Sequence, residues 1–150
     1  MKKKLLLSLL IVISMFVVVG CNKDKIEDNP INKLNFNELL FSEPKGYTST
    51  YFFGSDEDET KSYVYGSTGS IIMNFQEGKD YSDIENLLYS KHIEKEINGF
   101  TWKIIEDYNG KVDSILYYTR HNGDLYLIEL NSFSQYQKYM EEFINSVSFE

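Results

Sequence analysis

One thiol and two imidazole rings are the side chains of this 150-residue chain best suited to nucleophilic or acid–base chemistry. They belong to Cys21, His92 and His121. A single cysteine excludes an intramolecular disulfide and any zinc site built from several thiolates. The Gly-x-Ser-x-Gly motif of a nucleophile elbow does not occur. A Ser-His-Asp triad assembles in space and has no sequence signature. The catalytic inventory is therefore thin, and we expect both histidines on polar surfaces.

Three short segments offer metal ligands, but none has the spacing of a familiar site. His92 precedes Glu94 by two residues and His121 precedes Asp124 by three, and neither pair matches the His-Glu-x-x-His pattern of zinc enzymes. Residues 56–59 read Asp-Glu-Asp-Glu but lack the glycine and the terminal glutamate of an EF-hand loop. We expect no metal site, no cofactor and a solvated acidic loop, with weak Ca²⁺ binding by that loop as the alternative.

A glycosidase would need a pair of opposed carboxyl groups, and most acidic residues of this chain stand in polar segments. Glu129 alone interrupts an apolar run, Leu127-Ile128-Glu129-Leu130. Alternation along a strand places Glu129 on the face opposite Ile128 and Leu130, so an exposed sheet position is expected. No acid is nominated as catalytic.

Aromatic side chains are the other surplus, and 22 of the 23 lie after residue 20. Those best placed to bind sugars or a partner are Tyr47, Trp102, Tyr108, Tyr117, Tyr118 and Tyr126. Because the chain has no alanine, the same residues are needed to fill the interior. Packing is therefore their default role and binding the alternative.

The first 20 residues have the pattern of a secretory signal. Three lysines at positions 2–4 precede an apolar run, residues 5–19, that two serines interrupt. At 1.5 Å per residue a helix of this length is about 22 Å long, short of the roughly 30 Å of bilayer hydrocarbon. A cleaved signal peptide at residues 1–20 is favoured over a permanent span.

The end of this segment, Val18-Val19-Gly20-Cys21, resembles the lipobox of bacterial lipoproteins. The resemblance implies that the Cys21 thiol accepts a diacylglyceryl group and that a membrane peptidase cuts between Gly20 and Cys21. Two acyl chains hold a protein stably at a membrane, at about 0.8 kcal/mol per buried methylene. The alternative is an uncleaved signal anchor with an inert cysteine. Residues 21–33 are polar, contain Pro30 and are expected to form a lipidated flexible tether.

Residues 34–150 are expected to fold as a single domain, and the charge of the chain limits its partners. Residues 1–20 carry three lysines and no acid, so residues 21–150 carry 12 basic and 23 acidic side chains and a net charge of −11. A field of this sign repels nucleic acid and anionic lipid headgroups and attracts cations and basic partners. No nucleic-acid partner is expected.

The N-terminal half of the domain predicts short strands followed by a helix. The strands are expected at residues 36–41, 47–53, 61–65 and 70–75, separated by glycine-containing turns. A helix over residues 82–96 is indicated by a capping box at its start and by apolar residues at helical spacing.

The C-terminal half predicts an antiparallel meander and a closing helix. Strands at residues 101–107, 112–121 and 125–131 are joined by Asn109-Gly110 and Asn122-Gly123, pairs that favour type I′ turns. The helix is expected to begin at Ser134, with Gln137 completing a capping box. Its apolar stripe consists of Tyr136, Met140, Phe143, Ile144 and Val147.

This order of elements predicts an α+β domain in which two helices pack on an antiparallel sheet. The opening Phe41-Ser42-Glu43-Pro44-Lys45-Gly46-Tyr47, the central Ile97-Asn98-Gly99-Phe100-Thr101-Trp102 and the closing run at 143–149 together resemble small lipoproteins of low-GC Gram-positive bacteria. The resemblance implies a PsbP-like α/β/α sandwich that serves as a binding or assembly module, although fold alone does not give function.

The sequence thus predicts a lipid-anchored protein at the extracellular face of the cell membrane that binds or scaffolds and is not an enzyme. Its expected partners are the membrane, through the lipid on Cys21, and a protein or envelope ligand. Two alternatives stay open. One is a cell-envelope hydrolase with Glu129 or His121 in a cleft, and the other is an inhibitor or immunity protein for a basic partner.

Overall fold

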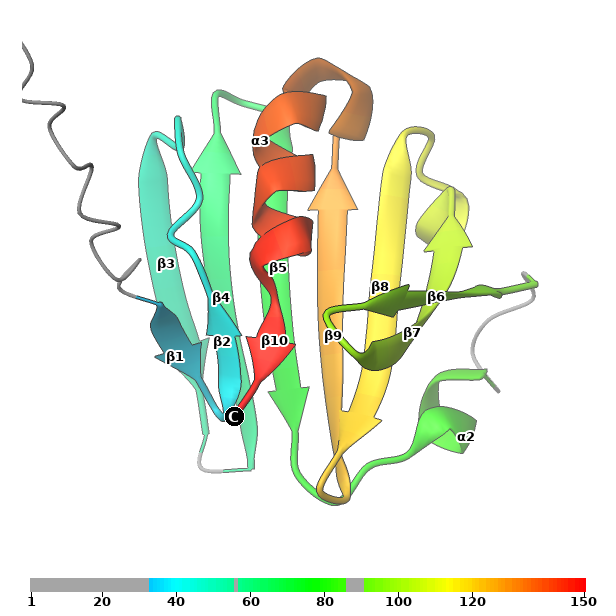
Figure 1. The fold of residues 1–150 in the computed structure, drawn as a ribbon. Helices are drawn as coiled ribbons and strands as arrows, with labels where there is room; N and C mark the ends of the chain where they lie inside the picture. Colours follow the sequence, from blue (N-terminus) through cyan, green and yellow to red (C-terminus); the bar gives the residue numbers. More distant parts are fainter. Residues whose placement is uncertain (1–32, 56, 86–90) are drawn as a thin grey trace, which may run out of the picture. The chain divides into compact units, whose positions relative to one another are not determined.

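The computed structural model describes residues 33–55, 57–85 and 91–150 (Figure 1). The predicted signal peptide, Gly20, Cys21 and the tether as far as residue 32 lie outside the described residues.

A seven-stranded antiparallel sheet forms the centre of the domain, in the order β3-β4-β5-β9-β8-β7-β6 (Figure 1). From one edge to the other, the strands are β3 (Ser49–Gly54), β4 (Asp58–Tyr65), β5 (Gly69–Gln76), β9 (Asp124–Asn131), β8 (Ser114–His121), β7 (Phe100–Glu106) and β6 (Ile93–Ile97). The two edges of the sheet are therefore β3 and β6.

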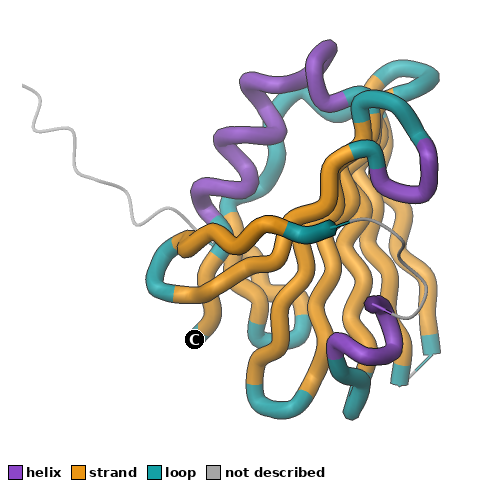
Figure 2. The backbone as a smooth tube through the Cα atoms, turned by 90° about the vertical axis from the view of Figure 1, so that its right-hand side faces the viewer, coloured by secondary structure: helices purple, strands orange, loops and turns teal. Residues whose placement is uncertain are grey.

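A smaller sheet and one helix cover one face of the large sheet. The small sheet has the order β1-β2-β10, with strands β1 (Leu34–Phe36), β2 (Leu39–Phe41) and β10 (Ser148–Phe149). Helix α3 (Phe133–Ser146) runs beside it on the same face (Figures 1 and 2). Two shorter pieces are α2 (Tyr81–Glu85) and the 3₁₀ turn η1 (Tyr108–Gly110). None of the helices in the described ranges is long and apolar enough to cross a membrane.

The predicted α+β domain with two packing helices, and with it the α/β/α sandwich, is wrong. The described residues are mostly in strands, and one C-terminal helix among them packs on the sheets. Of the helix expected over residues 82–96, the described part ends at Glu85, and Ile93–Ile97 is strand β6. The reason lies at Asn98 and Gly99, whose φ angles of 50° and 85° form the turn of the β6–β7 hairpin. Asn-Gly is a hairpin signal here, as it is at Asn122-Gly123.

Two turns also differ from the prediction. Asn37 and Glu38 have φ angles of 49° and 67° and divide the expected strand 36–41 into the hairpin β1–β2. Asn109-Gly110 belongs to η1 and not to a type I′ turn, because Asp107 already takes the left-handed conformation, with φ 50°. The three strands of the meander are nevertheless confirmed as neighbours, and Asn122-Gly123 has the two positive φ angles expected.

Two apolar clusters lie on opposite faces of the large sheet. The larger one joins the sheet to α3 and the small sheet, and it contains the predicted stripe of α3, with Met140, Phe143, Ile144 and Val147 buried and Tyr136 partly buried. The smaller cluster lies on the other face and includes Ile84 of α2. Its other buried members are Ile105, Leu116, Tyr118, Leu125 and Leu127. Burial on both faces explains the uninterrupted apolar runs at residues 115–118 of β8 and 125–128 of β9.

Candidate functional site

The two histidines lie apart and on different faces of the sheet. His92 is exposed just before β6, and its ring centroid is 6.3 Å from that of Tyr118, a member of the smaller cluster. His121 stacks on Phe149 in the larger cluster, with centroids 4.3 Å apart, and its Nε2 lies 3.7 Å from Glu38 Oε2. His92 is exposed, as expected, whereas His121 is partly buried against the aromatic rings of Phe100 and Phe149. The structure does not bring them together as a pair.

Glu129 lies on the face predicted for it but is not exposed. Its neighbours across the sheet are Ile72 and Leu116, and its side chain is 13% accessible. The Lys111 ammonium lies 3.0 Å from Glu129 Oε1 and covers it from the loop before β8. Glu129 therefore takes part in an ion pair with Lys111 on this face of the sheet.

Glu57 lies in the turn between β3 and β4, Asp58 and Glu59 are the first residues of β4, and Asp56 lies outside the described residues. The Ser55 amide donates to the Asp58 carbonyl at 2.8 Å, which closes the hairpin. Asn37 donates to Glu59 Oε2 at 2.9 Å, while Glu57 and Asp58 are exposed. Within the described ranges, no three His, Cys, Asp or Glu side chains are grouped closely enough to hold a metal ion.

Most of the aromatic residues proposed for binding are in the interior, as their default role predicted. Those that are buried are Trp102, Tyr117, Tyr118 and Tyr126. Tyr47 and Tyr108 are partly buried, and Tyr47 donates a hydrogen bond from its hydroxyl to Glu43 at 2.7 Å. Neither residue is free to stack fully on a ligand.

Buried tyrosine hydroxyls are held in their neutral form. Burial raises the pKa of Tyr65 to about 12 and raises the pKa values of Tyr63, Tyr117 and Tyr126 above the usual value near 10. The hydroxyls of Tyr65 and Tyr126 have no hydrogen-bond partner among the described residues. A tyrosinate base or nucleophile is therefore disfavoured at these positions near neutral pH.

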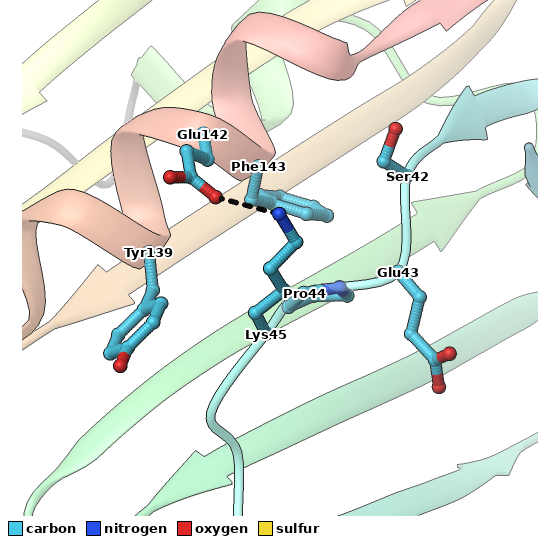
Figure 3. A pocket seen from close by; sticks show the side chains of 7 residues that line it. All are labelled: Ser42, Glu43, Pro44, Lys45, Tyr139, Glu142 and Phe143. Atoms are coloured by element: carbon cyan, nitrogen blue, oxygen red, sulfur yellow. Dashed lines mark ion pairs between the residues drawn. The ribbon is translucent and has the colours of Figure 1, made fainter. Parts of the chain in front are cut away.

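A small pocket of about 140 Å³ lies where the loop after β2 meets α3 (Figure 3). Lys45 reaches across it, with its ammonium 3.5 Å from Glu142 Oε2. Ser42 and Lys45 also have the Ser-x-x-Lys spacing of one class of serine nucleophiles, a match absent from the candidates above. Figure 3 shows the Ser42 hydroxyl pointing away from Lys45, which pairs with Glu142 instead. The pocket is smaller than the 300 Å³ or so typical of ligand sites.

A second pocket, of about 330 Å³, lies between α3 and the strands β6 and β8. Its lining residues are Lys95, Tyr117, Phe133, Glu141, Ile144 and Asn145. Burial and, to a smaller extent, the carboxylates of Glu141 and Glu106 raise the pKa of Tyr117. The pocket thus offers one neutral hydroxyl and charges of both signs. Neither histidine and no part of the Glu129–Lys111 pair is among its lining residues.

Three consecutive aromatic side chains on strand β3 form the most exposed apolar feature of the sheet. Tyr51, Phe52 and Phe53 are 56%, 62% and 61% accessible, and we call them the aromatic edge. Successive residues of a strand point to opposite faces. Phe52 lies on the face of α3 and the small sheet, where its ring meets that of Phe36 edge-on at 6.4 Å. Tyr51 and Phe53 therefore lie on the other face.

The other edge of the sheet has a different composition. Strand β6 reads Ile-Glu-Lys-Glu-Ile, and such alternating charges discourage pairing with another strand. Strand β3 reads Ser-Thr-Tyr-Phe-Phe-Gly and carries no charge. An uncharged aromatic edge strand offers unpaired backbone groups together with apolar surface. The sequence did not predict the aromatic edge as a site. The signal that could have indicated it is the run of three aromatic residues, because adjacent residues of a strand cannot all face the same core.

Comparisons with known proteins give no assignment. No protein-family model matches this chain, and neither the curated proteins nor the solved structures contain a match.

Proposed function

We propose that this protein is a lipoprotein anchored at the extracellular face of the cell membrane, and that its β domain binds a partner protein and does not catalyse a reaction. The observation that carries the binding function is the aromatic edge, where three neighbouring side chains are each more than half exposed on an uncharged edge strand. Aromatic residues are enriched at protein interfaces, and contiguous exposed apolar surface marks interaction sites.

The anchor rests on Val18-Val19-Gly20-Cys21, with lipidation of Cys21 after cleavage behind Gly20. Metabolic labelling with a fatty acid tests it. Wild-type protein is expected to carry the label and fractionate with membranes, whereas Cys21→Ser loses both properties because serine offers no thiol. Equal labelling of the two proteins would contradict the anchor and leave the binding function of the domain untouched.

Site-specific photo-crosslinking in intact cells tests the binding function. A photoreactive phenylalanine is placed at position 52 in the aromatic edge and, in a matched control, at position 93 in β6, where Ile93 is 59% accessible. We expect one recurring crosslinked protein from position 52 and none in common with position 93. Identical products from both positions, or no product from position 52, would contradict a specific binding role for this edge.

An inhibitor or immunity protein for a basic partner is the second candidate, and the acidic hairpin between β3 and β4 favours it. Glu57 and Asp58 are exposed directly beside the end of the aromatic edge. In this case the crosslinked partner is a basic enzyme or toxin, and the purified domain lowers its activity. The hydrolase alternative has less support, because Glu129 pairs with Lys111 and His121 lies stacked on Phe149.

A further inference from the structure

We infer that the partner binds as an extended strand that adds to the open edge of β3 and carries lysine or arginine beside the acidic hairpin. This inference rests on the proposed binding function and specifies how the aromatic edge is used. It rests on three features of the structure: the placement of the aromatic edge on both faces, the contrast between β3 and β6, and the charges at the end of β3.

The aromatic edge exposes side chains on both faces of the sheet, which favours a ligand that can contact both faces. Phe52 projects to the face of α3, while Tyr51 and Phe53 project to the opposite face. A ligand lying flat on one face, such as a stacked sugar, would contact either Phe52 or the pair Tyr51 and Phe53, but not all three. A strand paired with β3 sends its own side chains alternately to both faces and so contacts all three.

Backbone pairing is available at this edge. In an antiparallel pair, every second residue directs its N–H and C=O groups toward its partner strand, and the residues between direct theirs outward. Strand β3 pairs on one side with β4 from Ser49 to Gly54, and on its other side no strand of the described residues pairs with it. The exposed aromatic side chains thus flank a row of outward backbone donors and acceptors, the arrangement that strand addition requires.

The acidic side chains near the end of β3 favour basic residues in the incoming strand. The described part of the β3–β4 hairpin carries three acids, Glu57, Asp58 and Glu59, and one base, Lys61. The Lys61 ammonium lies over the rings of Phe41 and Tyr63, with centroid distances of 5.5 and 5.4 Å. Glu57 and Asp58 are exposed, and the net charge of −11 over residues 21–150 has the same sign. A second copy of this chain would carry the same net charge of −11, so a basic segment is favoured over self-pairing.

The probe is the capped synthetic peptide Lys-Val-Thr-Val-Thr-Val-Lys, titrated calorimetrically into the purified domain. We expect saturable binding that weakens with added salt. The matched peptide with glutamate at both ends is expected to bind at least about tenfold more weakly. A version of the lysine peptide with N-methyl groups on both threonines and the central valine is expected to lose a similar factor, because it cannot complete the backbone pairing.

Matched variants locate the binding. Phe52→Lys gives β3 the charged character of β6, and Phe52→Thr removes the aromatic ring while keeping a strand-forming residue. Both are expected to weaken the lysine peptide by about tenfold or more. Ile93→Lys makes the same change at the other edge and is expected to leave the affinity unchanged. Far-ultraviolet circular dichroism and thermal unfolding confirm that each variant is folded.

Each contrary result has a definite meaning. Equal affinity for the methylated peptide overturns strand addition, and equal affinity for the glutamate peptide overturns the basic partner. A dimer in sedimentation that Phe52→Lys abolishes makes a second copy the occupant and also overturns the inference. If the peptide does not bind while position 52 still crosslinks to one protein in cells, the inference fails and the binding function stands. If crosslinking fails as well, both fail.

Discussion

Tyr65 shows how one buried group ties the stability of this domain to pH. Its side chain is 1% exposed, its ring packs against those of Tyr136 and Tyr139, and its hydroxyl has no partner among the described residues. Ionising this hydroxyl inside the domain is costly, so its pKa rises to about 12. The unfolded chain gives up the same proton near pH 10. Stability from this group is therefore complete below pH 10 and is lost as the pH rises toward 12.

Tyr65→Phe is expected to change the free energy of unfolding by no more than about 1 kcal/mol at pH 8, because the hydroxyl that is removed is unpaired. Between pH 10 and 12 the wild type loses about 1.4 kcal/mol per pH unit from this tyrosine, and the variant does not. Urea unfolding at pH 8 and pH 11 measures the difference. Tyr51→Phe, at a side chain 56% exposed, is the control. A Tyr65→Phe variant as sensitive to alkali as the wild type would contradict this account.

Single positions were predictable from the sequence where local alternation decides them. The face of Glu129 follows from its neighbours Ile128 and Leu130, and the structure confirms it. Its low exposure does not follow, because Lys111 reaches it from a loop 18 residues earlier in the chain. His121 likewise is covered by Phe149 of β10, which is distant in sequence. Contacts of this kind depend on the packing of elements and have no local signal.

The first turn of helix α3 is capped by a residue from outside the helix, Asp113. The predicted capping box does not form, since Gln137 donates to Glu141. Instead, Asp113 from the loop before β8 accepts the Ser134 amide at 2.9 Å and the Ser134 hydroxyl at 2.7 Å. Its carbonyl also accepts the Phe133 amide at 3.1 Å. A carboxylate at this position satisfies free amides of the first turn and is favoured by the helix dipole.

Asp113→Ala is expected to destabilise the domain by about 1–2 kcal/mol, because it removes the cap. It also places alanine at a φ of 63°. Asp113→Asn keeps an acceptor and tolerates this φ, so it is expected to cost less. The comparison is made by chemical denaturation of both variants beside wild type. Equal losses for alanine and asparagine would show that the charge matters and the hydrogen bond does not, and no loss for either would remove the cap from the account.

Secondary structure was predictable where turn chemistry and periodicity agree. The stripe of α3 follows from its periodicity alone, whereas strands β8 and β9, joined by Asn122-Gly123, satisfy both conditions. The segment Ile93–Ile97 does not, because isoleucines four residues apart fit one face of a helix as well as one face of a strand. Its pairing with Phe100–Glu106 decides the outcome in favour of a strand. The fold class was mistaken for this reason, since a second helix was counted where the sheet gains its seventh strand.

At the scale of the whole molecule, the two edge strands of the large sheet differ in charge and in aromatic content. The charges of β6 protect it from pairing, while β3 is uncharged and aromatic and lies beside an acidic hairpin. The composition of β3 was readable from the sequence, but its position at an edge depends on the strand order. The aromatic edge could therefore be identified as a candidate site only from the fold.

Amide hydrogen exchange, with and without the lysine peptide, tests the central claim most directly, because it reports which backbone groups the ligand covers. We predict slower exchange within Ser49–Gly54, by about tenfold or more at saturation, with no change in Ile93–Ile97. Phe52→Lys is predicted to abolish the protection. Protection confined to β6, or to the pocket between α3 and β6, would contradict the claim that β3 is the binding edge.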